Sequence, residues 1–164
     1  MKKIFALLLT LCLLSPVFAQ GGGDDARNLF TFHRLAAVVP PFTGPTNAIR
    51  GIGGAGAPWQ IAKGHAGLNA SGKLEVHVRG LVLVSNRTNP IANFAAILSC
   101  QSFDAAKAPT VVNLVAGTSP ATAAGDADIE GTVQLPSPCF APIVFVAIPA
   151  TATAPARWLA VSGF

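Results

Sequence analysis

The stretch HAGLNASGKLEVHV, residues 65–78, decides the fold because it combines a turn with two segments of alternating side chains. In residues 73–78 every second side chain is aliphatic and the others are polar, as in a strand that is buried on one face. Residues 69–73 (NASGK) fit a three-residue hairpin loop in which Gly72 adopts the left-handed conformation. The stretch therefore predicts an antiparallel β-hairpin.

The loop also predicts which residues face each other across the hairpin. Leu68 lies opposite Leu74, and His65 lies opposite His77, so that the aliphatic side chains share one face. We expect the Cα atoms of the two histidines to be about 4.5–5.5 Å apart.

The same register, continued further, places Lys63 opposite Arg79. Two like charges in such a cross-strand pair are unfavourable. We therefore expect a β-bulge at Gly64, which also turns Trp59 and Ile61 toward the core.

Further short apolar segments, separated by Gly, Pro, Asn and Ser, predict additional strands. Residues 143–148 (IVFVAI) are apolar on both faces and predict a central strand, and residues 94–100 are nearly as apolar. Residues 126–135 alternate like the hairpin, and residues 158–161 predict the last strand. No amphipathic helix of useful length is visible, so the sequence predicts an all-β chain with a single antiparallel β-sandwich of about eight strands.

The region before residue 40 is ambiguous. The large apolar residues of 26–39 could line one turn of a helix or a first strand, and two prolines end the segment. We assign residues 20–48 to a flexible or partly ordered lead-in and residues 49–164 to the sandwich domain.

Residues 1–19 have the features of a bacterial secretory signal peptide. Two lysines precede an apolar run over residues 4–14, and a small residue, Ala19, closes the segment. The run is too short to span a bilayer. We expect cleavage near Ala19, a secreted or periplasmic mature chain that begins near Gln20, and no integral membrane span after cleavage.

Charge argues against a nucleic-acid partner. Of 11 Lys and Arg residues, Lys2 and Lys3 leave with the leader, so nine remain against seven acidic residues and the mature net charge is +2. The arginines are scattered rather than clustered with aromatic residues. Only 11% of the chain is charged, against a usual value of about a quarter. A surface so weakly charged leaves open a homo-oligomer or a cell-surface partner.

The cysteines predict one disulfide. Cys12 lies in the leader, where an acylated lipoprotein cysteine is the alternative, although Leu11 is larger than that reaction prefers. Cys100 and Cys139 remain as an even pair in an oxidising compartment. We expect their Cα atoms to lie about 4.4–6.8 Å apart, and the bond to stabilise the fold by about 4 kcal/mol.

The hairpin offers candidate metal ligands. The imidazoles of His65 and His77 could share a divalent metal ion, with Glu75 on the same face as a third ligand. The alternative is a solvated polar face, because two ligands on an exposed sheet do not form a site. The sequence therefore marks these residues as candidates but predicts no metal site and no cofactor.

Three carboxylates form a second candidate group. Asp126, Asp128 and Glu130 alternate along one predicted strand and project from one face roughly 7 Å apart. They could bind calcium or another ligand, or act as paired acids in glycoside hydrolysis. The alternative is the outward face of an edge strand, where acidic residues discourage aggregation. No catalytic residue is predicted.

The chain carries a series of short motifs in a fixed order. They are GAPW (56–59), GLV (80–82), NP (89–90), Cys100, GDA (125–127), LPSPCFAPIVFV (135–146), Trp158 and Gly163. In this order the chain resembles a family of small secreted bacterial β-proteins that have a Cys pair and no known activity. The resemblance covers residues 49–163. It implies an exported all-β domain with a Cys pair, and it implies no activity, cofactor or site residue.

The sequence therefore predicts an exported, non-enzymatic protein that serves as a binding, adhesion or structural module. One alternative is an extracellular hydrolase that uses the acidic strand. Another is a small outer-membrane β-barrel, because Trp158, Ala160, Ser162 and Phe164 alternate toward an aromatic residue. The absence of tyrosine and the two-sided apolar strand argue against a barrel.

Overall fold

The computed structural model describes residues 28–163, which form twelve strands and no helix. The predicted leader and its cleavage site lie outside the described residues. No helix in the described part of the chain is long and apolar enough to cross a membrane. The strands are β1 (Asn28–Phe32), β2 (Leu35–Ala37), β3 (Gly53–Gly54), β4 (Trp59–Gln60), β5 (Lys63–Asn69), β6 (Lys73–Arg79), β7 (Val82–Leu83), β8 (Asn93–Phe103), β9 (Pro109–Pro120), β10 (Ala127–Thr132), β11 (Phe140–Ile148) and β12 (Arg157–Ser162).

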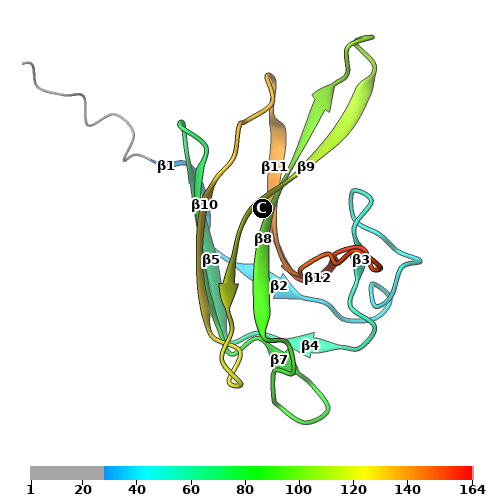
Figure 1. Ribbon diagram of the computed structural model, residues 1–164, viewed down its shortest axis with the longest axis vertical. Coiled ribbons are helices and arrows are strands. Elements are labelled where there is room, and N and C mark those ends of the chain that lie inside the picture. Colours follow the sequence, from blue (N-terminus) through cyan, green and yellow to red (C-terminus); the bar gives the residue numbers. More distant parts are fainter. Residues whose placement is uncertain (1–27, 164) are drawn as a thin grey trace, which may run out of the picture.

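Two sheets pack face to face and confirm the predicted all-β sandwich. The four-stranded sheet has the order β1-β5-β6-β10, and the larger sheet has the order β2-β12-β11-β8-β9, with β3 also paired to β12. All strand pairs among the described residues are antiparallel except the short β3–β12 contact. Figure 1 shows the four-stranded sheet on the left and the larger sheet beside it. The strand number exceeds the predicted number of about eight. Three of the twelve strands have only two residues, and two others lie near the N-terminus.

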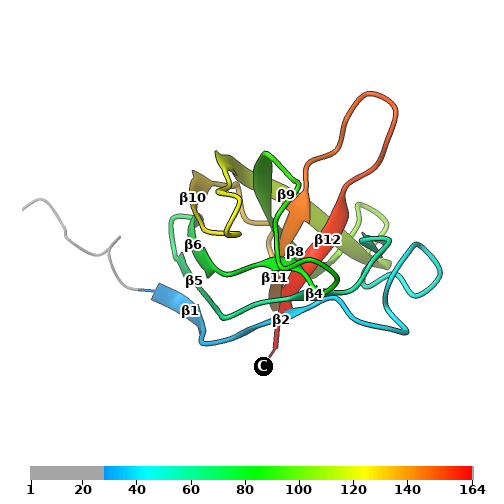
Figure 2. The same cartoon turned by 90° about the horizontal axis from the view of Figure 1, so that it is seen from below.

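The two N-terminal strands tie the sheets together. β1 pairs with β5 in one sheet, and β2 pairs with β12 in the other. The chain crosses between the sheets at His33 and Arg34, as the view in Figure 2 allows the reader to follow. The two sheets therefore include strands from the segment before residue 49, which the sequence assigned to a flexible or partly ordered lead-in.

The hairpin register is confirmed. Leu68 lies opposite Leu74 and His65 opposite His77. Gly72 has a φ of 84°, in the left-handed region that the three-residue loop requires. The side-chain oxygen of Asn69 accepts a hydrogen bond from the backbone N–H of Lys73 at 2.8 Å, which closes the turn.

The bulge expected at Gly64 is wrong. The pairing of β5 with β6 continues without a shift to Lys63, which lies opposite Arg79. Like charges are tolerated there because the Arg79 guanidinium turns to the third strand and contacts the Asp128 carboxylate, with N–O distances of 2.8 and 2.9 Å. Trp59 is buried, as predicted, although no bulge places it.

The central strand and the disulfide are both confirmed. β11 lies between β8 and β12, and its residues 144–147 are fully buried. Cys100 on β8 is joined to Cys139, directly before β11, with the Cα atoms 5.0 Å apart. A stable disulfide indicates that the protein works in an oxidising, extracellular-type environment.

The outer face of the larger sheet is covered in part by residues 40–58. Phe42 in this segment packs on Trp158, with ring centroids 6.4 Å apart. The Arg50 guanidinium donates hydrogen bonds to the carbonyl oxygens of Ser99 (2.8 Å) and Ala141 (2.6 Å), so it holds the segment against β8 and β11.

The two margins of the sandwich differ. At one margin β10 crosses β9 so closely that a Cβ on Gly131 would lie 1.8 Å from the carbonyl oxygen of Ala116, and a Cβ on Gly117 would lie 2.3 Å from that of Glu130. We call this margin the seam. At the opposite margin β1 and the start of β11 leave an opening between the sheets.

Candidate functional site

The opening between the sheets is a cleft of about 610 Å³. Ligand-binding cavities commonly occupy about 300–1,000 Å³, so the cleft has the size of a small-molecule site. Residues 30–36 line it from the β1–β2 side, and Ala141, Pro142 and Gly163 line it from the larger sheet.

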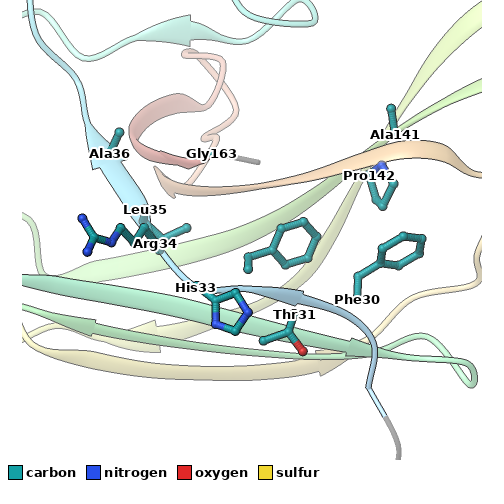
Figure 3. A pocket seen from close by; sticks show the side chains of 10 residues that line it. Phe30, Thr31, His33, Arg34, Leu35, Ala36, Ala141, Pro142 and Gly163 are labelled. Carbon is teal, nitrogen blue, oxygen red and sulfur yellow. The ribbon is translucent and has the colours of Figure 1, made fainter.

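The apolar part of the cleft comes from alternation in β1 and from the start of β11, which pairs with β8 but not with β12. Phe30 and Phe32 are two residues apart and project to the same side, with ring centroids 6.5 Å apart. Phe32 is buried, whereas Phe30 remains 37% exposed at the rim. Figure 3 shows Phe30 and Pro142 on facing sides of the opening.

The cleft stays open because β12 is shorter than β11. The pairing of these two strands reaches only Phe145, and the Ser162 hydroxyl accepts a hydrogen bond from the backbone N–H of Val144 at 2.9 Å. Toward its start β11 therefore has no pairing with β12, and Pro142 lacks a backbone donor altogether. An apolar, solvent-accessible surface remains between the sheets.

The other end of the cleft is polar and basic. Figure 3 shows Arg34 extending from the β1–β2 connection, away from Phe30, with His33 between them in this view. A second hollow of about 540 Å³ shares His33, Arg34 and Leu35 with the cleft. Its lining also includes Lys63 and His65, from β5.

The candidate metal ligands come together only in part. The rings of His65 and His77 stack with centroids 4.7 Å apart and an interplanar angle of 26°. Glu75 forms an ion pair with Lys73. The carboxylate beside His77 is that of Asp128, 2.8 Å from Nδ1. Across residues 28–163 no group of three or more His, Cys, Asp or Glu side chains is arranged to hold a metal ion.

The three carboxylates lie on or beside β10, at the edge of the four-stranded sheet. Asp126 accepts a hydrogen bond from the backbone N–H of Gly80 at 2.8 Å, and Glu130 lies 3.6 Å from the Lys73 ammonium. The Arg79 guanidinium, and after it His77, lowers the pKa of Asp128 to about 2. An acid that is ionised so readily is a poor proton donor near neutral pH.

This arrangement predicts a measurable pH effect. Because the folded-state pKa of Asp128 is depressed, its contribution to stability is present above its ordinary value of 3.8 and is lost as the pH falls toward about 2. We expect an NMR titration to give a pKa near 2 for the Asp128 carboxyl. The Arg79→Gln variant should move it upward, while Arg87→Gln should not. An unchanged Asp128 titration in Arg79→Gln would contradict the assignment.

The cleft itself was not predicted from the sequence. Its lining joins residues 30–36 to residues 141, 142 and 163, which are far apart in the chain. The available signal was the group of large apolar residues in 26–39, which could have been read as partly exposed.

The chain matches no protein-family model, and no curated protein or solved structure is significantly similar to it. No relative therefore supplies an activity or a ligand for the cleft.

Proposed function

We propose that the protein is an exported, non-enzymatic binding module that holds a small apolar ligand in the cleft between its sheets. The observation that carries this proposal is the open cleft of about 610 Å³ with Phe30, Phe32, Leu35 and Pro142 in its lining. Export is supported by the leader-like sequence of residues 1–19 and by the disulfide. The location would be the periplasm or the exterior of a bacterial cell.

The physical basis of binding is the removal of apolar surface from water. Burial contributes roughly 25 cal/mol for each Å² of apolar surface. Phe30 is 37% exposed at the rim, so a ligand that covers it gains from this term. Phe32 and Leu35 are already buried and give the cleft a fixed apolar floor that needs little rearrangement on binding.

The proposal is tested with a neutral, apolar fluorescent probe, N-phenyl-1-naphthylamine. We expect saturable binding with enhanced fluorescence. The Phe30→Asp variant should weaken it by at least about tenfold, because a carboxylate at the rim must lose water when the probe covers it.

Leu29→Asp is the matched control. Leu29 lies on the same strand and is 56% exposed, but it does not line the cleft. This variant should bind the probe like the unaltered protein, and both variants should unfold at similar denaturant concentrations. Absence of saturable binding, or equal losses in the two variants, would rule the proposal out.

A further inference from the structure

Four side chains that can carry positive charge gather at the polar end of the cleft. His33 and Arg34 come from the β1–β2 connection, and Lys63 and His65 come from the start of β5. Arg34 and Lys63 are exposed, and neither forms an ion pair or a side-chain hydrogen bond with another residue of the described range.

The acidic residues of the sandwich do not neutralise this group. Among residues 28–163, no Asp or Glu lines the cleft or the second hollow. On the same sheet, Glu75 is paired with Lys73, and Asp128 is paired with Arg79 and His77. The cations beside the cleft are therefore available to an external anion.

The apolar and basic parts adjoin through shared residues. His33, Arg34 and Leu35 line both hollows, so one molecule can contact the apolar lining and the cations together. A purely apolar ligand would leave Arg34 and Lys63 without a partner, and a small inorganic anion would leave Phe30 exposed. A ligand with an apolar chain and an anionic head is complementary to both parts.

Building on the proposed function, we infer that the cleft binds a fatty acid. Its hydrocarbon chain lies between Phe30, Phe32 and Pro142, and its carboxylate is bound by Arg34 and Lys63. The planar guanidinium of Arg34 can donate two parallel hydrogen bonds to a carboxylate, and the ammonium of Lys63 adds a second positive charge.

The test compares dodecanoate with 1-dodecanol as competitors of the neutral naphthylamine probe, at neutral pH and below the concentration at which either self-associates. The two compounds have the same chain length and differ in head-group charge. We expect dodecanoate to bind about tenfold more tightly, which is the size of effect that two partly exposed ion pairs supply, and we expect added salt to reduce the difference.

The double variant Arg34→Gln/Lys63→Gln should bind both compounds with the affinity that the unaltered protein has for the alcohol. The double variant Arg87→Gln/Lys107→Gln removes the same charge at positions outside both hollows and should keep the preference for dodecanoate. This control separates a local carboxylate site from the effect of net charge.

The possible results distinguish the fatty-acid inference from the proposed apolar binding site. Equal affinity of the unaltered protein for dodecanoate and dodecanol would overturn the fatty-acid inference and leave the apolar site intact. A preference that both double variants lose equally would also overturn it, because net charge alone would then explain the difference. Failure of the probe and both competitors to bind would overturn the proposed function together with the inference.

Discussion

Replacing both bonded cysteines, in Cys100→Ala/Cys139→Ala, is expected to lower the free energy of unfolding by about 4 kcal/mol. The two cysteines are separated by 39 positions, so the bond closes a long loop in the unfolded chain and restricts its conformations. The loop contains β9 and β10, the two strands of the seam. Alanine is chosen because Cys100 is fully buried and a polar replacement would lack a partner.

Chemical denaturation, followed by circular dichroism, measures this effect. A reducing agent should lower the midpoint of the unaltered protein to that of the double variant and should leave the variant unchanged. A loss of less than about 1 kcal/mol, well below the usual cost of losing such a bond, would show that the bond does little for stability.

Gly131→Ala is expected to destabilise the fold by about 3 kcal/mol, the upper part of the usual range for overpacking. A Cβ at this position would lie 1.8 Å from the carbonyl oxygen of Ala116 and 2.4 Å from its carbonyl carbon. Both contacts are with backbone atoms, so no side-chain rotation can relieve them. The two strands of the seam would have to move apart.

Gly56→Ala is the matched control for this substitution. A Cβ on Gly56 would meet no heavy atom within 4 Å, and the residue is exposed. We expect its effect on the free energy of unfolding to be within about 0.5 kcal/mol. Equal midpoints of denaturation for the two variants would mean that the strands of the seam are not in contact in solution.

Local patterns predicted the hairpin and the disulfide well. The register of residues 65–78 follows from a two-residue period and from one glycine that the turn requires. The cysteine pair follows from counting, because only Cys100 and Cys139 remain when the leader is set aside. Neither inference needs information about distant parts of the chain.

The prediction of a bulge at Gly64 was wrong because it considered the repulsion between Lys63 and Arg79 without the neighbouring strand. The third strand, β10, brings Asp128 to the Arg79 guanidinium and removes the need for a bulge. β9 was missed for a related reason. Its apolar residues face both the core and solvent, as Val111 and Val115 are exposed, so the period-two signal is absent.

The candidate site was harder to predict than the fold. Residues 26–39 gave no clear helix or strand pattern because β1 is exposed over most of its length and β2 has only three residues. The cleft exists because the pairing of β12 with β11 stops at Phe145 and leaves the start of β11 without β12 beside it, which is a relation between strand lengths. No local pattern reports such a relation.

The contrast between the two margins has a consequence for how such a chain can evolve. At the seam, Gly117 and Gly131 admit no side chain without moving a backbone. At the cleft, Phe30, Arg34 and Ala36 are exposed, and exchanges of exposed residues usually alter stability by about 0.5 kcal/mol or less. Substitutions can therefore change the lining of the cleft without changing the packing of the two sheets. Chains that keep the seam glycines and the cysteine pair would diverge in the lining of the cleft while retaining the same two-sheet architecture.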